Sequence, residues 1–158
     1  MENAEGVAPA RLRTLPSRLL NQAAVPANRL AHRALTAAGS RRYQYALLAA
    51  LEEFGSASQA ALGRRTGIDR SDVVATINEL AQRTLVERSP DPSDRRRNII
   101  TITPAGTRHL DTLDRLLADV QDELLAPLSA AERRELVRLL TRVVDHHAEA
   151  GSARSAVP

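Results

Sequence analysis

The apolar residues of this chain recur mostly at every third or fourth position, the spacing that amphipathic helices require. The longest such run begins after Thr103 and Pro104, which fit the N-cap and the first turn of a helix. We expect this helix to end at Pro127, and a last helix to follow the capping box of Ser129 and Glu132. The apolar positions of these two helices are Leu110, Leu113, Leu116, Leu117, Val120, Leu124 and Leu125, then Leu136, Leu139, Leu140, Val143 and Val144.

The N-terminal part of the chain shows the same spacing, interrupted by proline and glycine. The stretch from Leu15 to Ala38 is helical in pattern, but we expect Pro26 to start or kink a turn, because proline lacks the N–H that a helix interior needs. Gly39 is the predicted C-terminal cap, and Ser40 is the predicted N-cap of a second helix that Gly55 ends. The apolar face of this second helix comprises Leu47, Leu48, Leu51 and Phe54.

Two short helices follow in close succession. Ser58 is the predicted N-cap of the first, which ends at Gly67, and Asp69 is the predicted N-cap of the second. One face of the second helix carries Val73, Ile77 and Leu80. The opposite face carries Arg70, Ser71, Ala75 and Asn78. Such a face of small and polar residues can lie flat against another molecule.

The apolar period changes from helical to alternating at Leu85, which predicts two β-strands, LVERS and NIITIT. Between them, the segment SPDPSDRRR is rich in proline, aspartate and serine, which stiffen the backbone and form turns. We expect a hairpin with Arg95, Arg96 and Arg97 at its tip. Like charges at this density are unfavourable alone and favourable beside phosphates.

This order of elements predicts a mainly α fold, a winged helix-turn-helix with a small β-hairpin wing. The recognition helix, Arg70 to Arg83, would enter a major groove of DNA. The wing arginines would reach the neighbouring minor groove, where the weakly hydrated guanidinium is favoured.

Composition narrows the available chemistry. A length of 158 residues fits one domain, and the absence of cysteine excludes disulfides and thiolate nucleophiles. All 22 basic residues are arginine, which excludes a P-loop lysine or a Schiff-base lysine. The sequence has no G-x-S-x-G, no H-E-x-x-H and no convergent pair of carboxylates. We therefore expect neither an enzyme nor a cofactor.

The positions of the charged residues along the chain are more informative than the net charge. A net charge of +3 does not by itself indicate a nucleic-acid binder, but arginines cluster at three places. The clusters are Arg41 with Arg42, Arg64 with Arg65, and Arg95 to Arg97. Solvated surface charges are the alternative interpretation of each cluster.

The sequence shows no sign of a membrane segment. The longest apolar run, Tyr45 to Leu51, is far short of the roughly 20 residues that cross a bilayer. The N-terminal residues lack the pattern of a secretory signal. We therefore expect a cytoplasmic protein.

The stretch DPSDRRRNIITITPAG resembles the wing signature of the MarR family of bacterial transcriptional regulators. The matching residues are Asp91, Pro92, Asp94, Arg95, Arg96, Thr103 and Gly106. Upstream, SQAALGRRTGIDRSDVVATINELAQRTLVER is similar to the family's helix-turn-helix, and the resemblance covers roughly Leu15 to His147. Two residues depart from the pattern. Thr84 stands where glycine is usual, which predicts a reshaped helix end, and Pro26 is unusual in the first helix.

The resemblance implies a homodimer that binds double-stranded DNA. Residues 15–39 and 104–148 would form a helical dimerisation region, and residues 40–103 the DNA-binding region, with disordered ends at 1–14 and 149–158. Each subunit would present one helix-turn-helix to half of a palindromic operator. The stripe from Leu110 to Leu125 favours a dimer independently, because it is more apolar than one small domain readily covers.

The predicted DNA contacts fall into three groups. The recognition helix contributes Arg70, Ser71, Asp72, Ala75 and Asn78, the wing contributes Arg95, Arg96 and Arg97, and phosphates are contacted by Gln59, Arg64 and Arg65. By resemblance, Asp94 braces the wing instead of touching DNA. Asp72 has two interpretations, as a partner of the helix dipole or as an acceptor for a cytosine amino group.

The resemblance also implies a small aromatic or phenolic effector, bound where the dimer helices meet the DNA-binding region. Arg33 and Tyr45 are the candidate contacts, and packing in the core or at a cap is the alternative. We expect no metal site, because His146 and His147 point to different sides of a helix and no third ligand accompanies His32 or His109.

These interpretations together predict a repressor of transcription. An anionic effector would release it from a pseudo-palindromic operator by changing the spacing of its two DNA-binding lobes. A winged-helix module that binds other proteins is the first alternative, and a hydrolytic or metal enzyme is the second.

Overall fold

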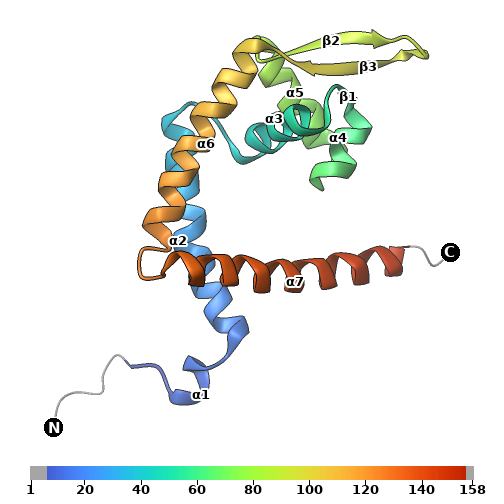
Figure 1. Cartoon of the computed structure of the whole chain (residues 1–158). Coiled ribbons are helices and arrows are strands. Elements are labelled where there is room, and N and C mark those ends of the chain that lie inside the picture. The colour runs from blue at the N-terminus through green and yellow to red at the C-terminus, as the bar shows by residue number, and fades with distance from the viewer. Residues whose placement is uncertain (1–6, 156–158) are drawn as a thin grey trace. The chain divides into compact units, whose positions relative to one another are not determined.

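The computed structural model describes residues 7–155, with side chains described up to residue 151 (Figure 1). The helices are α1 (Ala10–Arg13), α2 (Pro16–Ala37), α3 (Arg42–Phe54), α4 (Gln59–Thr66), α5 (Arg70–Gln82), α6 (Pro104–Leu124) and α7 (Ala130–Ser155). The strands are β1 (Ala57–Ser58), β2 (Val86–Asp91) and β3 (Asp94–Ile102). The prediction of a mainly helical winged helix-turn-helix is confirmed.

The chain divides into two compact units, and the division falls within α6, after Val120. In the first unit the core lies among α3, α4, α5 and an antiparallel sheet of order β1-β3-β2. Its fully buried side chains include Leu47, Leu48, Leu51, Leu62, Val73, Ile77, Leu80, Val86 and Ile100. Leu110 of α6 belongs to the same cluster, so the first half of α6 is part of this unit. The sequence predicts the boundary between the DNA-binding region and the dimerisation region earlier, between residues 103 and 104.

Several predicted helix ends are confirmed by their geometry. Gly39 and Gly67 have φ of 65° and 69°, and the backbone reverses there at the ends of α2 and α4. The hydroxyl of Ser58 accepts a hydrogen bond of 3.2 Å from the N–H of Ala61. Thr103 caps α6 in the same way. These ends set the lengths of the helices that carry the functional residues.

Three predictions for the first helices are wrong. Pro26 does not start a turn but lies inside α2. The missing backbone hydrogen bond and the clash of the proline ring cost about 3 kcal/mol. The long helical segments on both sides of Pro26 offset this cost. Ser40 is not the N-cap of α3, because Arg41 holds that position and the buried Ser40 hydroxyl donates to Gln44 Oε1 (3.0 Å). Phe54 is 56% exposed, since it is the last residue of α3 and lies beyond the core.

The wing is longer and its turn tighter than predicted. Only Pro92 and Ser93 separate β2 from β3, so Arg95 to Arg97 belong to β3 and do not form a loop at the tip. A third strand, β1, pairs with β3 and places Ala57 opposite Ile100. A strand of two residues is too short to show an alternating pattern, which is why the sequence did not predict it.

The prediction of a reshaped end for α5 is wrong. Thr84 has φ 57°, and the N–H groups of Thr84 and Leu85 donate to the last turn of the helix, as glycine would allow. The threonine therefore adopts the left-handed conformation that its branched side chain disfavours. Gly106 lies close by, and a Cβ there would stand 2.1 Å from the carbonyl oxygen of Leu85. This contact gives the physical reason for glycine in the wing motif.

The second unit comprises the end of α6, a turn and α7. The predicted capping box is confirmed: Ser129 N–H donates to Glu132 Oε2 (2.7 Å) and Glu132 N–H donates to Ser129 Oγ (3.2 Å). Arg133 forms an ion pair of 2.6 Å with Asp122. The exposed apolar side chains of α7 are Val137, Leu139, Val143 and Val144.

The sequence predicted disorder at both ends of the chain, and part of each end is helical. Residues 10–13 form α1, and α7 continues to Ser155. Residues 149–155 include two alanines, one glutamate and one arginine, which favour helix, beside one glycine, which disfavours it. Residues 1–6 and 156–158 lie outside the described part of the chain.

Candidate nucleic-acid interface

Helices α4 and α5 form a helix-turn-helix connected by Gly67, Ile68 and Asp69. Ile68 is only 8% exposed and anchors the turn in the core. Asp69 occupies the N-cap position of α5, although its side chain makes no capping hydrogen bond, and Asp72 lies in the first turn. Since α3 packs against both helices, the orientation of α5 is set by apolar contacts.

The outer face of α5 is open to solvent. Its exposed side chains are Arg70, Ser71, Val74, Ala75 and Asn78, whereas Asp72 is half-buried. Most of these side chains are small, so the helix backbone can come close to a flat surface. The structure thus gathers four of the five residues predicted for base contacts on one accessible face.

Two aspartates hold the turn of the wing. Asp91 Oδ1 accepts from the N–H (2.9 Å) and the hydroxyl (2.7 Å) of Ser93, and these bonds lower the pKa of Asp91. Asp94 Oδ1 accepts from the N–H of Arg96 (3.0 Å), and its Oδ2 lies 3.4 Å from Nε of Arg97. Both carboxylate oxygens of Asp94 therefore contact residues of its own hairpin.

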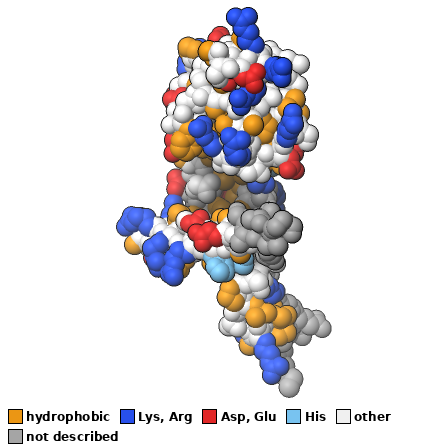
Figure 2. Space-filling model, turned by 90° about the vertical axis from the view of Figure 1, so that its right-hand side faces the viewer, with side chains coloured by type: hydrophobic (Ala, Val, Ile, Leu, Met, Phe, Trp, Pro, Cys, Tyr) orange, Lys and Arg blue, Asp and Glu red, His pale blue; other side chains and the backbone are white. Residues whose placement is uncertain are grey.

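A groove of about 550 Å³ opens between α4, the start of α5 and β3. Its lining residues are Gln59, Ala60, Gly63, Arg64, Ile68, Arg70, Arg96, Arg97 and Asn98. These include four arginines and no carboxylate, so the groove suits an anion. Figure 2 shows arginine side chains spread over the surface of this lobe.

Two of the predicted arginine contacts do not line this groove. Arg95 is exposed on β3, next to the turn of the wing. The guanidinium carbon of Arg65 lies 5.1 Å from the ring centroid of Phe54, a cation–π contact. Of the pair at the end of α4, Arg64 is thus the one that lines the groove.

Arg88 of β2 is absent from the sequence prediction, yet it reaches the outer face of α5. Its Nη2 donates to Oδ1 of Asn78. Arg88 stands opposite the buried Ile100 in the strand pairing, so it projects from the same side of the sheet as the core residues. The signal in the sequence was its position two residues after Val86, which is also buried.

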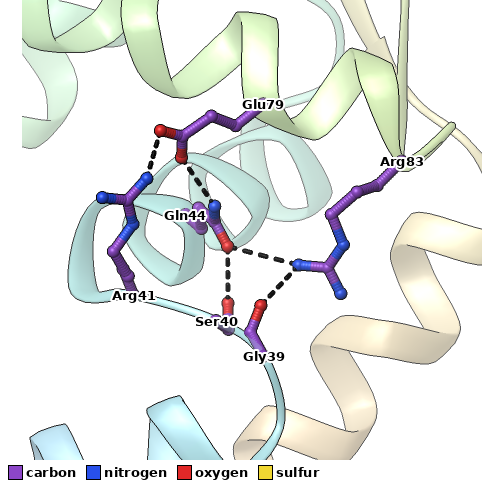
Figure 3. Close-up of polar contacts among 6 residues, drawn as sticks. All are labelled: Gly39, Ser40, Arg41, Gln44, Glu79 and Arg83. Atoms are coloured by element: carbon purple, nitrogen blue, oxygen red, sulfur yellow. Dashed lines mark hydrogen bonds and ion pairs between the residues drawn. The ribbon is translucent and has the colours of Figure 1, made fainter.

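A polar network connects α5 with the beginning of α3 (Figure 3). Glu79 forms an ion pair with Arg41 and accepts a hydrogen bond of 2.8 Å from Nε2 of Gln44. Arg41 and, after it, Gln44 lower the pKa of Glu79. Arg83, at the end of α5, donates to the carbonyl oxygen of Gly39. The partners are far apart in sequence, so no local spacing predicts the network.

A second cavity, of about 470 Å³, lies beside this network. It is lined by His32, Arg41, Arg42, Tyr43, Gln44, Asp72, Ala75, Thr76 and Glu79. Arg33 and Tyr45, the predicted effector contacts, do not line it. The Tyr45 hydroxyl instead donates to Asp114 of α6 (2.8 Å), and burial, followed by Asp114, raises the pKa of Tyr45.

The histidines show no arrangement for a metal. Within the described residues, no three side chains of His, Asp or Glu lie close enough together to hold a metal ion. The rings of His146 and His147 pack edge to face. Nε2 of His109 is buried without a hydrogen-bond partner, and burial, followed by the charge of Arg83, lowers the pKa of His109.

None of the described helices is both long enough and apolar enough to cross a bilayer.

The sequence and the structure of this chain are similar to those of known transcriptional regulators. The model of the MarR family matches residues 35–97, which include α4, α5 and the turn of the wing. The transcriptional repressor NicR of Pseudomonas putida is 33% identical over 108 residues, 68% of this chain and 68% of that protein. The structure is similar to that of Bordetella bronchiseptica BpsR, whose DNA binding is regulated by 6-hydroxynicotinic acid (TM-score 0.75, 26% identity, 87% and 99% of the two chains). Similarity extends to Streptomyces coelicolor PcaV in complex with its natural ligand (TM-score 0.70, 29% identity, 88% and 98%).

Proposed function

Because the chain belongs to the MarR family of transcriptional regulators, we propose that it is a repressor that binds a pseudo-palindromic operator as a homodimer and leaves it when a small anionic effector binds. The observation that carries the proposal is the groove in which Arg64, Arg70, Arg96 and Arg97 converge without a lining carboxylate. A row of guanidinium groups beside an exposed helix face fits a phosphate backbone and the adjoining major groove. The bacterial cytoplasm is the proposed place of action.

The proposed docking assigns one role to each element. The exposed face of α5 enters the major groove, where Ser71, Ala75 and Asn78 meet base edges. Gln59 and Arg64 of α4 contact phosphates, which position the protein without reading sequence. Arg95 and Arg96 extend from the wing toward the neighbouring minor groove. Asp94 keeps the hairpin in shape through its bond to the backbone of Arg96.

A homodimer is supported by the apolar surface of α7. Val137 is 61% exposed and Val144 is 65% exposed on a helix that a monomer would leave largely in water. Contiguous exposed apolar side chains favour an interface. Two copies related by a two-fold axis would place two helix-turn-helix units on the two halves of a palindromic site.

The proposed effector site is the cavity between α2, α3 and α5. His32, Arg41 and Arg42 provide positive charge there, and the half-exposed ring of Tyr43 can pack against an aromatic ring. An aromatic carboxylate combines the two features, and BpsR responds to such an acid. Since Arg41 also holds Glu79 of α5, an anion bound to Arg41 would act on the helix proposed to read DNA.

The direct test combines a gel-shift assay with sizing by light scattering. The probe is the DNA that flanks the protein's own gene, with an unrelated duplex as competitor at low and moderate ionic strength. We expect a dimer in solution, a complex that resists the unrelated competitor, and dissociation on adding an aromatic carboxylate such as 6-hydroxynicotinate. A monomeric protein, or one that binds no duplex at low ionic strength, would refute the proposal and favour a module that binds other proteins.

A further inference from the structure

Arg88 and Asn78 form a pair that decides which groups α5 offers to a base. We propose that Arg88 is a positioning residue that holds Oδ1 of Asn78 against the wing, so that Asn78 presents its amide donors outward and selects guanine over adenine. The inference rests on the proposed function, in which α5 enters the major groove.

The positions of the two residues support this role. Asn78 is exposed on the same face of α5 as Ser71 and Ala75, at helical spacing. Arg88 lies on β2, whose core-facing side packs against α5, and its Nη2 donates to Oδ1 of Asn78. The ion pairs formed within residues 7–151 do not include Arg88. No carboxylate there draws its guanidinium away from Asn78.

The chemistry of the pair allows one orientation of the amide. A guanidinium has only donors, so Asn78 must turn its carbonyl oxygen, and not its NH2 group, toward Arg88. A hydrogen bond from a charged donor is roughly twice as strong as a neutral one, which keeps the amide in this orientation. The free edge of Asn78 is then the NH2 group, with its two donors.

The orientation of the amide determines which base it can read. Asparagine recognises adenine with both groups at once, accepting from N6 and donating to N7. An oxygen held by Arg88 is turned away from that geometry. Guanine instead presents two acceptors in the major groove, O6 and N7, which match an edge that only donates. The pair therefore converts an adenine-reading side chain into a guanine-reading one.

The test is selection of bound sequences from random duplexes, performed with the wild type, Arg88→Met, Asn78→Ala and the double variant. Methionine keeps an unbranched side chain but cannot donate, and Arg115→Met on α6 is the control for loss of one charge. The wild type should prefer guanine at one position of each half-site. Arg88→Met should shift that position toward adenine by on the order of tenfold, the worth of one bidentate contact. Asn78→Ala should remove the preference, and adding Arg88→Met should then change nothing further.

The outcomes separate the inference from the function on which it rests. A wild type that enriches no sequence overturns the proposed function and the inference with it. If the wild type enriches an operator but Arg88→Met retains the base preference, or lowers affinity equally for all duplexes, the inference alone is overturned. Asn78→Ala replaces an exposed helix residue with the best helix former, so it keeps the test open if Arg88→Met does not fold. In that case the inference requires that Asn78→Ala loses the guanine preference, and a retained preference overturns it.

Discussion

Nη1 of Arg83, the C-cap residue of α5, donates a hydrogen bond of 2.7 Å to the carbonyl oxygen of Gly39, where α2 has ended and α3 has not begun. The same nitrogen lies 3.4 Å from Oε1 of Gln44. One turn earlier on α5, Glu79 pairs with Arg41. The helix proposed to read DNA is therefore tied by side chains to the junction beside the second cavity, a route by which an effector could act on it.

Replacing Arg95 and Arg96 with alanine should weaken operator binding, and the loss should be greatest at low ionic strength. Each phosphate contact that is lost should reduce the slope of log K against log salt by up to about 0.9, because fewer counterions are released on binding. The control is the pair Arg108→Ala and Arg115→Ala on α6, which removes the same charge from another element. Equal salt slopes for the wild type and the wing variant would contradict the proposed wing contact.

Glu79→Gln should remove the ion pair with Arg41 and lower the free energy of unfolding by about 0.2–1 kcal/mol at pH 7, since both partners are more than one-third exposed. Arg41 lowers the folded-state pKa of Glu79, so this contribution is present above the unfolded-state pKa, about 4.3, and is lost as pH falls through the folded-state pKa. Denaturant titrations at pH 7 and at about pH 3 should show a smaller difference between variant and wild type at the lower pH. Glu53→Gln on α3 is the control and should change little at either pH.

Gly106→Ala should destabilise the protein by about 3 kcal/mol or more. The added Cβ would lie 2.1 Å from the carbonyl oxygen of Leu85 and 2.7 Å from a side-chain atom of Ile102, so backbone has to move. Thermal unfolding followed by circular dichroism measures the loss. Gly151→Ala on α7 is the matched control, because its Cβ meets no atom within 4 Å and should be neutral or slightly stabilising. Similar melting of both variants would argue against the close approach at Gly106.

Thr84→Gly should stabilise the protein by about 1 kcal/mol, which raises the melting temperature by roughly 2–4 °C. Thr84 holds φ 57°, a conformation that costs a β-branched residue energy and that glycine adopts freely. Part of this gain is offset by the greater backbone entropy of glycine in the unfolded chain. Thr66→Gly, at the helical end of α4, is the control and should destabilise. A lower melting temperature for Thr84→Gly would mean that the threonine is not strained.

His109 should make stability fall as pH drops below about 6.5, the ordinary pKa of histidine. Burial lowers its folded-state pKa, so the unfolded chain binds the proton first as pH falls below about 6.5, and stability falls with pH until the folded state is protonated as well. His109→Leu should flatten this part of the curve, measured by urea unfolding at several pH values. His146→Leu, at an exposed position of α7, should leave it unchanged. A steep curve in His109→Leu would assign the dependence to other groups.

Local patterns in the sequence were sufficient for most elements. Helical spacing located α3 to α7, and the caps at Ser58, Gly67 and Ser129 were correct because each depends on residues only a few positions away. Pro26 was misjudged because proline is a strong local signal, whereas the stability of α2 comes from its whole length. Arg65 was assigned with Arg64 as one cluster, although only Arg64 lines the groove.

The sequence alone was thus enough for the winged helix-turn-helix, its exposed α5 face and its wing arginines, because periodicity and turn chemistry act over short distances. Only the tertiary structure brought Arg88 to Asn78, joined Glu79 to Arg41, and turned Tyr45 toward Asp114. Those contacts depend on how separate elements pack, and a side chain's partner across a core has no fixed spacing along the chain. The general surface proposed to meet DNA follows from local pattern, while the groups that orient its side chains follow from the fold.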